Sequence, residues 1–184
     1  MSEKRSSVES QNAPKRDSSL SRNASSVGDG YVVTWSQYSG DIFDFAFAYS
    51  ATKYEIYGRM YDGVGQPVGE AFQVNQLASG TQQHSVVQEL DGGRFVVAWM
   101  ATLLDGDGQG IRARVYEPDG SPAGDEFQVN TTTAGDQRSP HVAQVEGGFV
   151  ILWDADDAGG GYDRYGQRFS VAGQPLGGEC KVYQ

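Results

Sequence analysis

The chain has 184 residues, including 25 glycines and one cysteine, and a formal net charge of −10. One cysteine excludes a disulfide scaffold and a Cys-based zinc site, and the acidic excess argues against binding to a nucleic-acid backbone. No run of 18 apolar residues occurs, so we expect no membrane insertion. This length can bury a real core, and so many glycines favour a turn-rich β protein over a helical bundle.

Residues 1–22 are predicted to be a flexible tail. They contain five Lys or Arg residues and many serines, and they lack the apolar stretch of a secretory signal. Residues 1–11 fit this description best. Residues 12–27 match the segment that precedes the glycine-rich turn at Gly148 in four positions. They therefore form either a part of the tail or a degenerate first strand.

The next feature is an aromatic stripe in the first part of the repeat domain. Phe43, Phe45, Phe47 and Tyr49 alternate with small or acidic residues. In an extended strand this alternation puts all four rings on one face. We expect that face to bind a partner, either a second subunit or a glycan, or else to cover the domain's own core.

A segment of 15 residues then occurs three times without a gap, beginning at Tyr61, Tyr116 and Phe169. Each copy has glycine, proline, glycine and valine at the same offsets. An apolar pentapeptide ending in tryptophan precedes each copy, and these pentapeptides are YVVTW at 31–35, FVVAW at 95–99 and FVILW at 149–153. Chance rarely repeats such a pattern, so the chain is built from repeats.

Each repeat is predicted to form four short strands. The tryptophan pentapeptides are apolar on both faces, as in a strand inside a structure, and IRARVY alternates apolar and polar residues. The prediction is an all-β fold of three four-stranded antiparallel repeats that resemble propeller blades, with a β-trefoil as the alternative. The repeat domain covers residues 23–184: repeat 1 is 23–84 with an insertion at 36–55, repeat 2 is 85–139 and repeat 3 is 140–184.

The loop after the second tryptophan offers a calcium site. Asp105, Asp107 and Gln109 stand at alternate positions, as in the first half of a calcium-binding loop. The usual distal glutamate is absent, because Tyr116 occupies the twelfth position. The loop is predicted either to hold a Ca²⁺ cofactor with these three residues or to be a solvated Asp-Gly turn.

Other repeated or chemically reactive residues are predicted to have structural roles. The three tryptophans of one repeat column, Trp35, Trp99 and Trp153, are predicted to be packing residues. Arg59 and Arg114 share a column and are expected to face water or an acidic neighbour. His84 and His141 fall at non-equivalent positions, so they predict no metal pair, and Cys180 occupies a phenylalanine column that suggests a core position.

The pattern GGFVVxW, then an Asp-Gly loop, GIxARxY, PxGxEFQVN and TAGDQ resembles a tandem repeat of large bacterial secreted proteins that also carry RTX or cadherin-like modules. The resemblance runs from Gly28 to the end and is best in 91–154. It implies a four-stranded propeller blade, strung in arrays outside the cell, and therefore an extracellular or cell-surface location. Three blades are too few to close a propeller, which needs about four to eight.

On these grounds the sequence predicts a non-catalytic extracellular protein that acts in assembly or adhesion, as a fibre or surface-structure subunit. Self-association is the expected partnership and a glycan the second. The alternative function is a lectin-like carbohydrate-binding or calcium-binding module. A propeller glycosidase ranks last because no catalytic motif occurs, and no catalytic residue is assigned.

Overall fold

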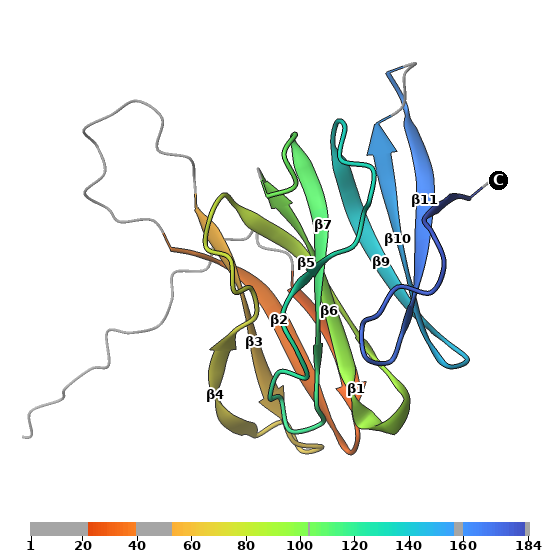
Figure 1. Cartoon of the computed structure of the whole chain (residues 1–184). Coiled ribbons are helices and arrows are strands. Elements are labelled where there is room, and N and C mark those ends of the chain that lie inside the picture. The colour runs from red at the N-terminus through yellow and green to blue at the C-terminus, as the bar shows by residue number, and fades with distance from the viewer. Residues whose placement is uncertain (1–21, 40–52, 103, 157–159, 183–184) are drawn as a thin grey trace, which may run out of the picture.

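The computed structural model describes residues 22–39, 53–102, 104–156 and 160–182. They form three antiparallel sheets of four strands each, side by side along the chain (Figure 1). This confirms the all-β fold and the three four-stranded, blade-like repeats. Each strand described pairs within its own sheet, so the arrangement is that of blades and differs from the β-trefoil alternative.

The first blade contains β1 (Arg22–Val27), β2 (Gly30–Tyr38), β3 (Tyr54–Tyr61) and β4 (Pro67–Gln73). The second contains β5 (Gln82–Glu89), β6 (Phe95–Thr102), β7 (Gln109–Tyr116) and β8 (Phe127–Gln128), with a 3₁₀ turn at Asp91–Gly93 before β6. The third contains β9 (Gln137–Val145), β10 (Gly148–Asp156), β11 (Tyr162–Ser170) and β12 (Cys180–Lys181). Each sheet follows chain order, with β1, β5 and β9 at one edge and β4, β8 and β12 at the other.

The aromatic stripe cannot be placed. Phe43, Phe45, Phe47 and Tyr49 lie in 40–52, outside the described residues. The prediction that they bind a partner therefore stays a prediction.

The core lies between neighbouring blades. Because side chains alternate along a strand, each blade has two faces, and the second blade turns one toward the first blade and the other toward the third. Between the first two blades, Val32 and Ile56 pack with Trp99 and Tyr116 of the second. Between the last two, the second blade packs on Phe149, Ile151 and Trp153. The tryptophan strand of the second blade is apolar on both faces because a blade covers each of them.

The tryptophan prediction is confirmed for two of the three residues. Trp99 and Trp153 are 0% and 1% exposed, whereas Trp35 is only partly buried. Trp35 belongs to the face of the first blade that would meet a preceding blade. No described residue covers that face as the first blade covers Trp99.

The first strands of the last two blades carry matching β-bulges. In β5 the register shifts between Gln83 and Val86, opposite Trp99, and His84 has φ of 54°. In β9 the shift lies opposite Trp153, and Ser139 also has φ of 54°. A side chain in this left-handed region costs energy, so each bulge is a strained feature built into the repeat.

In each of the first two blades an asparagine follows the fourth strand and forms hydrogen bonds with the third strand. The Asn130 side-chain oxygen accepts the Ile111 amide at 2.8 Å, and its NH₂ donates to the Thr132 carbonyl at 3.0 Å. Asn75 does the same with Ile56 and the Leu77 carbonyl. These buried contacts fix where the chain leaves one blade for the next.

Candidate functional site

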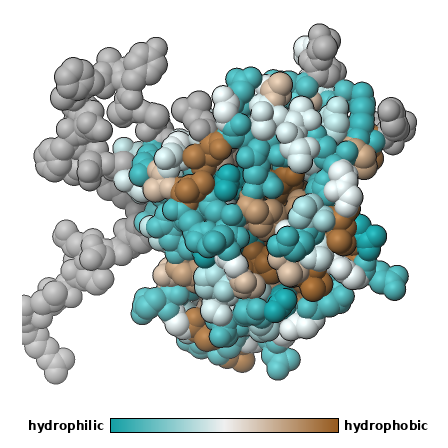
Figure 2. Space-filling model, in the orientation of Figure 1, coloured by the Kyte–Doolittle hydropathy of each residue, from teal (hydrophilic) through white to brown (hydrophobic). Residues whose placement is uncertain are grey.

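A groove of about 730 Å³ lies between the second and third blades. Its two walls are the chain around β8 and the connection that follows β11. Figure 2 shows brown, hydrophobic atoms among hydrophilic ones on this side of the molecule. The residues lining the groove include Val115, Phe127, Val129, Thr131, Gln167, Phe169, Gln174 and Pro175.

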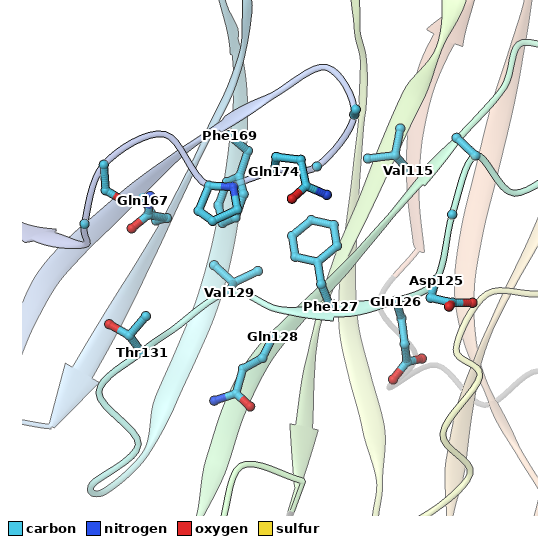
Figure 3. A pocket seen from close by; sticks show the side chains of 17 residues that line it. Val115, Asp125, Glu126, Phe127, Gln128, Val129, Thr131, Gln167, Phe169 and Gln174 are labelled. Carbon is cyan, nitrogen blue, oxygen red and sulfur yellow. Dashed lines mark hydrogen bonds between the residues drawn. The ribbon is translucent and has the colours of Figure 1, made fainter.

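The floor of the groove is aromatic and its rim is polar. Phe127 and Val129 point toward the connection that carries Gln174, whereas Gln128 points to the opposite side of the strand (Figure 3). The Phe127 ring lies 5.2 Å from the Phe169 ring, centroid to centroid. The two rings are tilted by 44°, Phe169 is buried and Phe127 is partly exposed, so Phe127 is the aromatic ring that a ligand can reach. The exposed Gln174 amide can both donate and accept hydrogen bonds beside it.

A glycine lets the turn of the third blade pack closely on Phe127. Gly173 has φ of 77°, and a Cβ at this position would lie 2.8 Å from Cε1 of Phe127. The equivalent Gly120 packs on the first blade, where a Cβ would lie 3.2 Å from Met60 Cγ and 3.7 Å from Cε1 of Phe72, the residue in the Phe127 column. The same turn therefore packs on the preceding blade at both interfaces, more tightly at the second.

The carboxylates at the groove are already engaged. Glu126 forms an ion pair with Arg112 at 2.7 Å, and the two side chains are 3% and 11% exposed. Glu126 also accepts the Gln76 amide of the first blade, and the Asp125 carboxylate accepts the Gln76 side-chain amide at 3.0 Å. The groove is therefore suited to binding a neutral polar ligand, and its acids serve to join blades.

Glu179 makes the corresponding contact between the second and third blades. Its carboxylate accepts the Thr131 amide at 2.7 Å and the Thr132 amide at 3.1 Å. Partial burial raises its pKa, but the hydrogen bonds from the Thr132 hydroxyl and from these amides outweigh burial, so the pKa lies below its usual value. The ionised form of Glu179 thus stabilises the contact between the blades.

A second group of acids lies where the chain crosses from the second blade to the third. Asp107 accepts the Gly135 amide at 3.1 Å, Asp136 accepts the Gln109 amide at 3.0 Å, and Asp156 accepts the Asp136 amide at 2.9 Å. Asp107 and Asp156 are exposed. The loops of two blades are therefore held together by three carboxylates, two of which reach solvent.

The predicted calcium residues have protein partners in this loop. Asp105 accepts from the Asn130 NH₂ at 3.0 Å, Asp107 has the Gly135 contact, and the Gln109 amide donates to Asp136. No group of three or more His, Cys, Asp or Glu residues arranged to hold a metal is found among the described residues. Calcium binding at Asp105, Asp107 and Gln109 stays a prediction.

The predictions for Arg114 and Cys180 are wrong. Arg114 does not face water or an acid: it is 9% exposed, its Nε donates to the Gly124 carbonyl at 2.9 Å, and its Nη1 donates to the Val74 carbonyl of the first blade at 3.3 Å. Cys180 is exposed, because it lies on the outer face of the third blade, which neither of the other described blades covers. His84 and His141 are both exposed.

The edge at which the blades converge holds few acids. β1 contacts β5, and β5 contacts β9. Of these three strands only β5 contains an acidic residue, Glu89 at its end, which accepts the Ser26 hydroxyl and the Gly28 amide of the first blade. The described first strands thus present no free pair of carboxylates.

Comparison with known proteins gives a fold relationship. No protein-family model matches the sequence, and no curated protein matches it. Among solved structures, an endo-arabinase from Bacteroides thetaiotaomicron is similar, with a TM-score of 0.55 and 12% identity over 89% of this chain and 61% of the enzyme. An α-L-arabinofuranosidase from Lactobacillus brevis is also similar, with a TM-score of 0.52 and 12% identity over 83% of this chain and 50% of the enzyme. The chain thus spans about half to three fifths of these structures.

These matches overturn the predicted function. A non-catalytic protein of assembly or adhesion is wrong on this comparison, because both solved structures are glycoside-cleaving enzymes. The glycosidase was the last of the predicted functions because the sequence contains no catalytic motif. Carboxylate pairs in such enzymes converge in space from separate strands, so no motif in one segment of sequence reveals them.

The groove was also missed. Gln174 has the same column as Gln66, and both stand in a Gly-Gln-Pro turn, so the sequence has no signal that separates a groove residue from an ordinary turn residue. The difference comes from the neighbouring blade, since the Gly173 turn packs on Phe127 of the second blade, whereas a Cβ at Gly65 would meet the Tyr31 hydroxyl of its own blade.

Proposed function

We propose that this chain acts on a carbohydrate polymer as part of a glycosidase-type β-propeller. The observation that carries the proposal is the stack of three blades, which superposes over 89% of its length on an enzyme named for cleaving an arabinose polymer. The groove between the second and third blades adds to it. Sugar rings stack on flat apolar surfaces and exchange hydrogen bonds with amide side chains, which are the features of this groove.

The groove fits a saccharide unit better than a charged ligand. Phe127 offers a partly exposed ring and Gln174 an exposed amide. Arg112 is bound to Glu126, so the groove offers no free cation from this pair to an anion. An uncharged pentose or hexose unit of a polymer meets these conditions.

Cleavage of the polymer would use the acids that two blades bring together. Glycoside hydrolysis needs two carboxyl groups, one to protonate the leaving oxygen and one to act as nucleophile or base. Asp107 and Asp156 are exposed acids held by backbone amides from the same crossing segment. We propose them as the carboxylates to test first.

Binding is tested by isothermal titration and by affinity electrophoresis in gels that contain arabinan. We expect retardation by the polymer and a weaker interaction after Gln174→Ala, by about tenfold for the loss of hydrogen bonds at an exposed site. Gln66→Ala is the matched control, because Gln66 has the same place in the first blade's turn and lies outside the groove. If neither arabinan nor other neutral polysaccharides retard the protein, the proposal fails.

We also propose a calcium site and a location outside the cell. Calcium at Asp105, Asp107 and Gln109, which would replace a catalytic role for Asp107, would rigidify the crossing between the blades, and thermal unfolding with and without EGTA tests it. A location outside the cell is implied by the resemblance to secreted repeat proteins and suits a polymeric substrate. Detection of the protein in the medium rather than in washed cells tests the location.

A further inference from the structure

The outer face of the first blade repeats a surface that the other two blades bury. Tyr31 and Tyr61 stack with their ring centroids 5.1 Å apart, as Phe95 and Tyr116 do at 5.0 Å in the second blade. The third blade has the same pair in Phe149 and Phe169, 5.4 Å apart. The pairs of the second and third blades are 0–2% exposed, whereas both tyrosines of the first remain partly exposed.

The same face carries polar groups that hold a preceding blade. In the second blade, Arg114 and the Tyr116 hydroxyl both donate to the Val74 carbonyl of the first, at 3.3 and 3.1 Å. Burial raises the pKa of Tyr116 to about 12, so this hydroxyl remains a donor. In the third blade Gln167 and Phe169 stand in these two columns, so only the first two blades have this pair of donors.

The first blade has the same two donors without the acceptor. Arg59 and Tyr61 occupy the columns of Arg114 and Tyr116, and Arg59 donates to the Gly69 carbonyl at 3.2 Å as Arg114 does to Gly124. The Arg59 Nε is buried and has no hydrogen-bond partner. The carbonyl that would complete the pattern belongs to a preceding blade, which the described residues do not supply.

The outer face of the third blade supplies the matching carbonyl. Val182 occupies the column of Val74, and its amide donates to the Arg164 carbonyl at 2.7 Å as Val74 donates to Ile56 at 2.8 Å. The two valines therefore have the same place in the backbone ladder. Val74 is 0% exposed beneath the second blade, whereas Val182 is 38% exposed, beside Leu176 at 43%.

The charged groups on this outer face have partners within the blade. Asp154 pairs with Arg164 at 2.9 Å, and the Arg168 guanidinium donates to the Glu146 carbonyl. Between them, Leu152 packs over Gly166, whose added Cβ would meet Leu152 Cδ2 at 2.8 Å. The centre of the face is therefore apolar, whereas Asp154, Arg164 and Arg168 stand where the second blade packs Met100, Ile111 and Val115 against the third.

We propose that the third blade of one copy docks on the first blade of a second copy, so that two chains close a six-bladed ring. Arg59 and Tyr61 of each copy then donate to the Val182 carbonyl of the other, and Trp35 is covered as Trp99 is. The interface continues the packing already present between the blades of one chain, head to tail, and a two-fold axis makes its two occurrences identical.

The new interface is weaker than the internal ones. Glu126 and Glu179 each bind backbone amides of the preceding blade, and Ala71 stands in their column in the first blade. Docking therefore lacks that carboxylate contact. We expect a dimer that dissociates on dilution, whereas the three blades of one chain stay together.

The test is the mass of the full chain in solution, measured by sedimentation equilibrium with three variants. We expect a dimer for the natural sequence, and monomers for Trp35→Arg alone and for Leu152→Arg alone. An equimolar mixture of these two variants restores association, because one intact face of each kind remains in the mixed pair. Circular dichroism and thermal unfolding confirm that each variant is folded.

A finer pair of variants separates docking from internal stability. Tyr61→Phe should raise the dissociation constant of the dimer about tenfold or more, since the ring contains two such hydrogen bonds. Tyr116→Phe removes the equivalent internal bond, so it should lower the unfolding midpoint and leave the dissociation constant unchanged. A monomer at 100 μM, as when residues 1–21 or 40–52 cover the face, would overturn the proposal. So would a Leu152→Arg variant that still dimerises, because that result places two first blades face to face.

Discussion

Replacing the tryptophans of one repeat column tests how the blades are held together. Trp99 is fully buried beneath the first blade, and its Nε1 donates to the Gln82 side chain at 2.9 Å. Trp35 is partly exposed, and its Nε1 meets Gln37 at 3.3 Å in an exposed contact. Identical substitutions at these two positions thus remove the same side chain from a covered and from an uncovered face.

We expect Trp99→Ala to lower the free energy of unfolding by about 3–5 kcal/mol, because the change removes a fully buried indole and leaves a cavity. The loss of the hydrogen bond leaves the Gln82 acceptor unpaired in the interior and places the effect at the upper end of that range. Trp35→Ala should cost about 1–2 kcal/mol in dilute protein, since only part of its apolar surface leaves water.

The measurement is urea unfolding followed by circular dichroism at a protein concentration below the dimer dissociation constant. The slope of the free energy against urea should be the same for both variants, since each unfolds the same surface. Equal losses for the two variants would refute the reasoning, because they would show that Trp35 is covered as well as Trp99. A loss below about 1 kcal/mol for Trp99→Ala would show that the interface between the first two blades is not a folded core.

Three other substitutions give expected outcomes by the same unfolding assay. Asn130→Ala should cost about 3 kcal/mol, since the Ile111 amide and the Thr132 carbonyl lose a buried partner. His84→Gly should leave stability unchanged or raise it by up to about 1 kcal/mol, because glycine relieves the strain at φ of 54°, and a clear loss would show that the imidazole makes a needed contact. The folded pKa of Glu179 lies below its unfolded value, so its ionised form stabilises the protein above the unfolded pKa, and this contribution is lost as the pH falls through the folded pKa. The stability gap between the natural chain and Glu179→Gln should therefore close in acid, and a gap that is constant down to pH 3 would contradict the assignment.

The repeat itself was accessible to sequence reasoning because its signals are local. The tryptophan strands, the Gly-x-Pro turns and the two-residue alternation in IRARVY each specify a strand or a turn without reference to the rest of the chain. The outcome is three blades with the expected four strands. The prediction for Trp99 and Trp153 was correct for the same reason, since a large aromatic in an apolar strand is buried by any neighbour.

The roles of residues that contact a neighbouring blade could not be predicted from the sequence. Arg114 has an acidic residue near it in sequence, yet its partners are carbonyls, and one of them is 40 residues away in the first blade. Cys180 stands in a column that other blades cover, and its own blade is the last of the stack. The walls of the groove come from two repeats, the chain around β8 and the Gly173 turn of the next blade. In each case a contact between repeats decides the role, whereas the pattern within a repeat is the same.

The release of reducing ends from arabinan tests the central claim most directly. The assay uses protein concentrated enough to dimerise, with Asp156→Asn and Asp107→Asn as variants and Asp119→Asn as the control in a turn at the far end of the blade. We expect the natural chain and the control to release reducing ends, and at least one of the two acid variants not to. No release by the dimeric natural chain, from arabinan or from other neutral polysaccharides, would contradict it.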